Sequence, residues 1–198
     1  MKTRFLLHGG RVKLRDERND SFFRELTKDL VDGDIVLSIG FANRDESGRL
    51  AYFERDKGFL LAQAKADIQI VNATYDDLPN QMRTAKSIYI TGGNAPELIN
   101  DIKKYPDFLK LLSGKLIAGT SAGACLFSTY YLNCPKPEVQ QGLGVFPIRL
   151  AVHYGSREFN STDEMVKLLE KYPQDLELVR LEECEWIVKE VDLEHIIN

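Results

Sequence analysis

The sequence predicts an α/β fold: a three-layer sandwich built on a mostly parallel, doubly wound sheet. Short apolar runs typical of buried strands alternate along the chain with segments of helical periodicity. Two of these runs lead directly into glycine-rich turns and then into helices, at Thr91–Asn94 and at Gly119–Gly123. Because the 198 residues contain no linker, repeat or low-complexity segment, we expect a single domain over residues 1–198.

The individual elements follow from apolar periodicity and from turn and capping residues. Strands are expected near residues 3–8, 34–40, 67–72, 87–91, 115–119, 149–153, 177–181 and 185–190. Helices are expected near residues 20–31, 50–65, 95–104, 106–113, 122–131 and 161–171, with capping residues for the first at 19–21 and for the last at 161–163. The proline- and glycine-containing segment 132–148 is expected to be a surface loop that could wall one side of a site.

Composition excludes several classes of function. A net charge of −4 argues against a general nucleic-acid binder, and no apolar run approaches membrane-spanning length. The apolar stretch near the N-terminus is too short for a signal peptide. The three cysteines, Cys125, Cys134 and Cys184, lack the spacing of a metal site and are odd in number. We therefore expect a cytoplasmic protein without a metal or cofactor, and no nucleic-acid or membrane partner.

The segment Gly119–Gly123 fits the G-x-S-x-G pattern of a strand-to-helix elbow that exposes a serine hydroxyl. It follows a short apolar strand and precedes a helical segment, as an elbow should. A serine nucleophile needs a base within hydrogen-bond reach and donors for the oxyanion that forms. Ser121 is the candidate nucleophile, and the N–H group of Ala122, at the helix N-terminus, is one candidate oxyanion donor.

A second turn, at Gly92 and Gly93, follows the predicted strand at residues 87–91. Paired glycines at the carboxyl end of a strand allow the backbone to approach a ligand closely. Two such turns can lie side by side at the carboxyl edge of a parallel sheet, where ligands bind. Either Gly92 or Gly93 could then supply the second oxyanion donor.

The candidate base is His153, which ends an apolar run after the elbow, whereas His8 lies in a glycine-rich turn and His195 is expected to be solvated. The acid that orients the imidazole should be a nearby carboxylate. Spacing alone does not choose among the six candidates, which are Glu158, Asp163, Glu164, Glu182, Glu183 and Glu185.

Taken together, four separated motifs resemble the peptidase E (aspartyl dipeptidase) and cyanophycinase family of serine peptidases. They are the Gly92-Gly93-Asn94 turn, the Ser-Ala-Gly-Ala segment 121–124, the Gly-Leu-Gly-Val-Phe-Pro segment 142–147, and the histidine that follows. The resemblance runs from residues 6–10 to Trp186 and implies a class I glutamine amidotransferase-like, or flavodoxin-like, fold.

The resemblance also implies roles for individual residues. Ser121 corresponds to the nucleophile and His153 to the base, while alignment of the segment 181–187 selects Glu183 as the acid, with Glu158 as the runner-up. Gly92, Gly93 and Ala122 are the expected oxyanion donors. Asn94, Arg157 and Glu158 are the expected substrate-binding residues, and Arg157 is the expected partner of an aspartyl side chain.

The implied function is a serine peptidase that hydrolyses short peptides through an acyl-enzyme, releases N-terminal aspartate and acts as a monomer or homodimer. One alternative is a peptidase for another acidic or isopeptide substrate, as in cyanophycinase. Another is a non-catalytic amidotransferase-like binding domain, against which the intact serine, histidine and Gly-Gly-Asn turn argue. An α/β-hydrolase is disfavoured because its residue order is Ser, acid, His.

Overall fold

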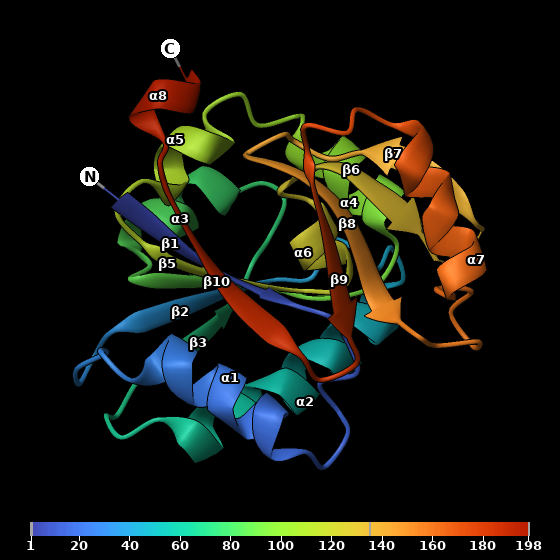
Figure 1. Cartoon of the computed structure of the whole chain (residues 1–198). Coiled ribbons are helices and arrows are strands. Elements are labelled where there is room, and N and C mark those ends of the chain that lie inside the picture. The colour runs from blue at the N-terminus through green and yellow to red at the C-terminus, as the bar shows by residue number, and fades with distance from the viewer. Residues whose placement is uncertain (1, 135, 198) are drawn as a thin grey trace.

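The computed structural model describes residues 2–134 and 136–197 (Figure 1). It contains a central six-stranded sheet. The strand order of this sheet is β10 (Trp186–Asp192), β1 (Lys2–His8), β5 (Leu116–Thr120), β4 (Ser87–Ile90), β2 (Ile35–Ile39) and β3 (Gln69–Asn72). All neighbouring pairs are parallel except β10 with β1. The carboxyl ends of β1, β4 and β5 therefore lie along one edge, where ligand sites form in such sheets.

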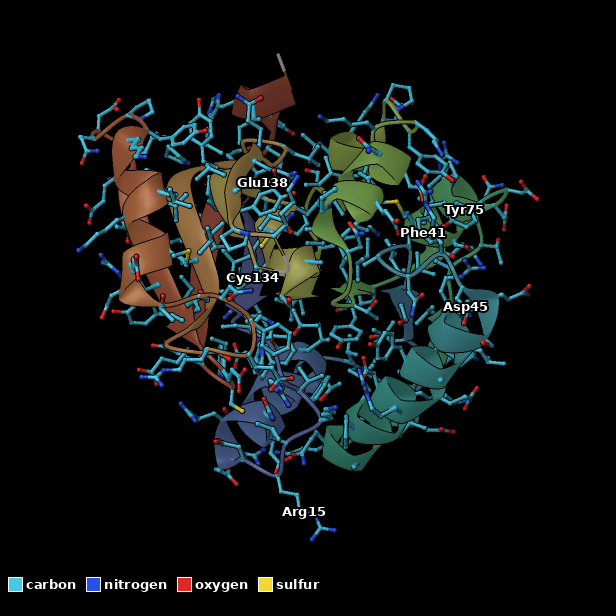
Figure 2. The ribbon with its side chains drawn as sticks, turned by 90° about the vertical axis from the view of Figure 1, so that its right-hand side faces the viewer. Arg15, Phe41, Asp45, Tyr75, Cys134 and Glu138 are labelled. Atoms are coloured by element: carbon cyan, nitrogen blue, oxygen red, sulfur yellow. The ribbon has the colours of Figure 1, made fainter. Side chains whose placement is uncertain are left out.

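One face of the central sheet is covered by α1 (Glu17–Thr27) and α2 (Glu46–Gln63). Alternation along β1 sends Leu6 into the core beneath these helices, with Phe22 and Leu60. Asp45 begins α2 by accepting a hydrogen bond from the N–H of Gly48 at 2.7 Å (Figure 2). None of the helices in the described part of the chain combines the length and the apolar character that a membrane span requires.

The opposite face packs against α3 (Leu78–Thr84), α4 (Ala95–Ile102), α5 (Phe108–Leu112), α6 (Ala122–Cys125) and a second sheet. This sheet has the order β7 (Glu138–Gln141), β6 (Ser128–Asn133), β8 (Phe146–Tyr154) and β9 (Glu177–Glu182). The ring of Phe5 on β1 joins the two sheets, because its centroid lies 4.8 Å from that of Phe127 and 5.1 Å from that of Phe146. On the same face, Phe41 stacks on Tyr75 at 4.0 Å (Figure 2).

The outer side of the second sheet is covered by α7 (Asp163–Val166) and the 3₁₀ turn that continues it (Lys167–Lys171). A small core of Leu132, Ala151, Val166 and Leu169 fills the space between them. A further short helix, α8 (Glu194–Ile197), follows β10. Helices and strands thus alternate in layers around a mostly parallel sheet, and the predicted α/β class is confirmed.

Several local predictions were wrong. The helix expected at 122–131 ends at Cys125, where the Ser128 hydroxyl donates to the Cys125 carbonyl at 2.9 Å, and the chain turns into β6. The loop expected at 132–148 contains β7 and the start of β8, so part of it belongs to the second sheet, which was not predicted. The first helix starts at Glu17, capped by Asp16 rather than by residues 19–21. Helices α3 and α8 were not predicted.

Candidate active site

A cavity of about 240 Å³ lies where the central sheet meets the second sheet. Its wall combines the turns after β4 and β5, the loop after β1, and residues of β6 and β8. Ser121 and His153 both line it, as do Gly92 and Gly93. The two glycine-rich turns therefore border a cavity at the carboxyl edge of the sheet.

Ser121 lies at the tip of a sharp turn between β5 and α6. Its backbone has φ 51° and ψ −108°, a combination that a non-glycine residue adopts only under strain. The turn is tight because a Cβ at Gly119 would lie 2.5 Å from the carbonyl carbon of Gly123, and one at Gly123 would lie 3.0 Å from that of Ile90. The two glycines of the G-x-S-x-G pattern are thus required by packing, and the hydroxyl is held clear of the sheet.

His153 connects Ser121 to Glu183. Its Nε2 lies 3.0 Å from the Ser121 Oγ, and its Nδ1 lies 3.3 Å from Oε1 of Glu183. Glu183 lies in the turn between β9 and β10, and β9 is the parallel neighbour of β8, which carries His153. With the proton on Nδ1 and donated to the carboxylate, Nε2 is free to accept the serine proton.

The electrostatic surroundings of His153 favour its neutral form. Burial of the ring lowers the pKa of His153 below its ordinary value of 6.5, and the nearby Arg11 lowers it further. The hydrogen bond and charge of Glu183 oppose this shift in part. Near neutral pH the imidazole is therefore unprotonated and able to act as a base.

The last residue of β1 and the short loop after it support all three segments of this array. The carbonyl groups of residues 8, 9 and 10 accept hydrogen bonds, in that order, from the N–H groups of Ser121, His153 and Cys184, each at 2.9 Å. Cys184 directly follows Glu183 in the chain. The nucleophile, base and acid candidates come from separate parts of the sequence, and this loop fixes their backbones relative to one another.

The loop itself is held by a buried polar network. The N–H of Gly10 donates to Nδ1 of His8, whose Nε2–H donates to the Asn19 side-chain oxygen, both at 2.9 Å. The Asn19 amide nitrogen donates to the carbonyls of Arg11 at 3.1 Å and Leu14 at 2.9 Å. Burial lowers the pKa of His8 to about 4, so this imidazole stays neutral. His8, which the sequence marked only as a turn residue, is a structural support for the site.

Arg11 is a component of the site that sequence reasoning missed. Its Nε lies 3.4 Å from Oε1 of Glu183, and its guanidinium forms an ion pair with Glu158. The guanidinium carbon lies 5.0 Å from the ring centroid of Phe159, and that ring stacks on His153 with centroids 3.9 Å apart. Glu158 thus pairs with Arg11, and Glu183 is the carboxylate that contacts the His153 ring.

The expected oxyanion donors are available. Within the described residues, the N–H groups of Gly92, Gly93 and Ala122 donate to no protein acceptor, and all three residues line the cavity. The turn at Gly92 also lies close to the nucleophile, since a Cβ there would lie 3.2 Å from the Cβ of Ser121. These groups border the space that a carbonyl attacked by Ser121 would occupy.

Two of the expected substrate-binding residues are placed elsewhere. The Asn94 side-chain oxygen accepts from the Glu97 N–H at 3.1 Å and caps α4, so its polarity stabilises a helix end. Arg157 is exposed and, like Asn94, does not line the cavity. Of the three residues expected to bind substrate, the structure brings only Glu158 to the cavity wall.

Two cysteines reach the cavity without competing with the serine. Cys125 lines the wall together with Cys134, which directly follows β6 (Figure 2). Burial raises the pKa of the Cys125 thiol well above its ordinary value and that of Cys134 to about 11. Because the thiolate is the reactive form, both remain unreactive thiols near neutral pH.

An α/β fold that presents a serine at an elbow beside a neutral histidine and a carboxylate belongs among the hydrolases with an activated serine. Comparison with protein families makes this specific. The profile of peptidase family S51 matches residues 5–196, so the chain belongs to this family of serine peptidases. No curated protein sequence matches the chain.

Solved structures share the fold. A crystal structure of a peptidase from an acI-B1 actinobacterium is similar with a TM-score of 0.69 and 22% sequence identity, and the match covers 96% of this chain and 84% of that one. The 1.5 Å crystal structure of a putative peptidase E protein from Listeria monocytogenes EGD-e has a TM-score of 0.66 and 18% identity, covering 96% of this chain and 100% of that one.

Proposed function

We propose that the protein is a serine peptidase that cleaves short peptides, with dipeptides carrying N-terminal aspartate as its substrates. Ser121 is the nucleophile, His153 the base and Glu183 the orienting acid. The observation that carries this proposal is the 3.0 Å contact between the His153 Nε2 and the Ser121 Oγ at a strained elbow. Contact of the other ring nitrogen with Glu183 supports the same assignment.

In the first half of the reaction, the Ser121 oxygen attacks the carbonyl carbon of the scissile bond while His153 Nε2 accepts the hydroxyl proton. The carboxylate of Glu183 stabilises the imidazolium that results. The N–H groups of Ala122 and of Gly92 or Gly93 donate to the oxyanion. Collapse of this intermediate breaks the C–N bond, and His153 returns its proton to the leaving amine.

In the second half, a water molecule takes the place of the amine. His153 removes a proton from this water, which attacks the acyl carbon of the ester on Ser121. The same N–H groups stabilise the second oxyanion. When the ester bond breaks, the proton passes from His153 to the serine oxygen, and the free amino acid leaves.

The cavity supports a small acidic substrate. Its volume of about 240 Å³ lies below the range typical of pockets for drug-sized ligands, which suits a short peptide better than a long chain. Three basic residues line it, Arg11, Lys13 and Arg55, against one acidic residue, Glu158. The similarity to a structure described as a putative peptidase E points in the same direction. An isopeptide substrate with free carboxylates would also suit this lining.

A panel of Asp-X, Glu-X and neutral dipeptides, together with a β-aspartyl isopeptide, tests the proposal by measuring released amino acid. We expect hydrolysis of Asp-X, and loss of at least about a thousandfold in Ser121→Ala and His153→Ala with the fold retained. A small sulfonyl fluoride should label Ser121 in the wild type, as peptide mapping by mass spectrometry would show. Absence of both labelling and hydrolysis would reject a catalytic role.

A further inference from the structure

One wall of the cavity carries a basic side chain that the reaction steps above do not use. Tyr52 and Arg55, both on α2, line the cavity together with Gly92 and Gly93. The guanidinium carbon of Arg55 lies 4.6 Å from the ring centroid of Tyr52, which supports the cation from one side. Arg55 is therefore a rigidly supported cation at the cavity.

The position of Arg55 is fixed from beneath by a buried polar chain. Its Nε donates to Oδ1 of Asp56 at 2.6 Å, and Oδ2 of Asp56 accepts from the Tyr89 hydroxyl at 2.9 Å. Asp56 and Tyr89 are both buried, with Tyr89 in the middle of the central sheet. Among residues 2–134 and 136–197, neither Nη of Arg55 has a hydrogen-bond partner. Two terminal nitrogens of a held guanidinium are thus left to bind a ligand.

The other charges at the cavity favour an anion. Arg11 is already engaged by Glu158 and Glu183, so its charge is largely balanced within the site. Lys13 is exposed and forms no ion pair within the described part of the chain. Within the described residues, Arg55 thus keeps both Nη groups, and Lys13 its ammonium group, free to bind a substrate. The fork of an arginine matches a carboxylate in geometry as well as in charge.

We propose that Arg55, supported by Tyr52 and assisted by Lys13, binds a carboxylate of the peptide substrate. This assignment rests on the proposed function, and it gives to Arg55 the role that the sequence suggested for Arg157. The carboxylate is either the side chain of an N-terminal aspartate or the carboxyl terminus of the dipeptide. Both sources present the same group to the guanidinium, and substrate analogues separate them.

The test is a binding measurement that needs no turnover. Titration calorimetry on the Ser121→Ala protein gives the Kd of Asp-Leu, Asn-Leu and Asp-Leu amide. The variant combines Arg55→Gln with Asp56→Asn, which removes the cation without leaving a buried carboxylate unpaired and keeps an acceptor for Tyr89. Arg49→Gln is the matched control, because Arg49 lies on the same helix over Tyr75 but does not line the cavity.

We expect the Arg55 variant to bind Asp-Leu about 30-fold more weakly, as for loss of a hydrogen-bonded charge, and the Arg49 control to bind normally. If the side-chain carboxylate is the ligand, the preference for Asp-Leu over Asn-Leu disappears in the variant. If the terminal carboxylate is the ligand, the preference for Asp-Leu over Asp-Leu amide disappears in the variant.

Unchanged Kd values for all three peptides, equal losses in both arginine variants, or no binding to the Ser121→Ala protein would each overturn the proposal. If the double variant fails to fold, Lys13→Gln serves as the second test, because Lys13 is exposed and its replacement disturbs no packing. We expect Lys13→Gln to weaken Asp-Leu binding a fewfold. Unchanged binding in this variant would count against the subsite. Hydrolysis by the wild type is measured separately. Carboxylate binding without hydrolysis would reject the proposed function and retain the subsite.

Discussion

Gly10 lies directly against the imidazole of His153. A Cβ at position 10 would lie 2.5 Å from Nε2 and 2.9 Å from Nδ1, and the backbone there has a φ of +111°. Gly10→Ala should therefore push the ring away from Ser121 and strain the loop. We expect kcat/KM to fall at least about a hundredfold, as peptide hydrolysis would measure.

The matched control for this change is Gly33→Ala. Gly33 also has a positive φ, of +86°, but nothing lies within 4 Å of the position its Cβ would take. It should lose some stability through backbone strain and keep its turnover. Equal losses of activity in the two variants would show that strain, and not contact with the ring, is responsible.

Glu183 and Glu158 provide a second comparison. In the proposed mechanism the charge of Glu183 stabilises the His153 imidazolium. Glu183→Gln removes this charge, and we expect kcat to fall about a thousandfold. Glu158→Gln breaks only the ion pair with Arg11 and should cost much less than this. Measured kcat values of both variants on one dipeptide decide which glutamate is the orienting acid. A larger loss in Glu158→Gln than in Glu183→Gln would assign that role to Glu158.

The proposed role of the Gly92–Gly93 turn in binding the oxyanion can be tested at Gly92 with less disturbance of the fold than at Gly93. A Cβ at Gly93 would lie 2.5 Å from the Ala42 carbonyl oxygen at a φ of +143°, so Gly93→Val should lose stability as well as activity. At Gly92 the added methyl would lie 3.2 Å from the Ser121 Cβ and 3.8 Å from its Oγ. We expect Gly92→Ala to fold and to lose about a hundredfold in kcat. Near-normal turnover in the folded variant would place the second donor elsewhere.

The buried His8 should make stability depend on pH. Its pKa is lowered from 6.5 to about 4, so between these values the unfolded chain binds a proton that the folded chain does not. The free energy of unfolding should fall as pH decreases from 6.5 towards 4, by about 3 kcal/mol from this group. Urea unfolding at several pH values should show a weaker dependence in His8→Asn. If the free energy of unfolding depends on pH equally in the wild type and in His8→Asn, the lowered pKa of His8 is contradicted.

The pH profile of activity should report the surroundings of His153. In the proposed mechanism His153 is the base and must be neutral. Burial lowers its pKa, so the acidic limb of kcat/KM is expected below pH 6.5. Arg11 also lowers this pKa, and Arg11→Gln should therefore move the limb to higher pH. Arg24→Gln, on the exposed side of α1, serves as the control. An unshifted limb in Arg11→Gln would show that Arg11 does not contribute to the lowered pKa of His153.

Sequence was most informative where function depends on a local motif. The elbow at Ser121 could be predicted because a strand, two glycines and a helix must follow in a fixed order. His153 was chosen for its place at a strand end, whereas the choice of Glu183 needed resemblance to a family. The strand at Ser128–Asn133 was missed although its β-branched and aromatic residues favour a strand, because an elbow suggested a longer helix.

What could not be predicted depends on contacts between distant segments. Arg11 follows a glycine-rich turn in sequence, and only the meeting of that turn with the β9–β10 connection brings it to Glu183. Likewise, the sequence shows Arg55 only as one of several charged residues in a helical segment. Its contact with the buried Asp56, and that of Asp56 with Tyr89, is known only from the structure. Local pattern carries no information about either arrangement.

The carbonyl groups of residues 8–10, at the end of β1 and in the loop after it, have a consequence for when the site assembles. They join the segments of Ser121, His153 and Cys184, which are far apart along the chain, and contacts of such long sequence separation form slowly. During translation the site stays unassembled until the turn at Cys184 has been synthesised and has reached the loop after β1. In refolding experiments, recovery of the proposed hydrolysis should therefore follow the docking of the turn at Cys184 onto residues 8–10.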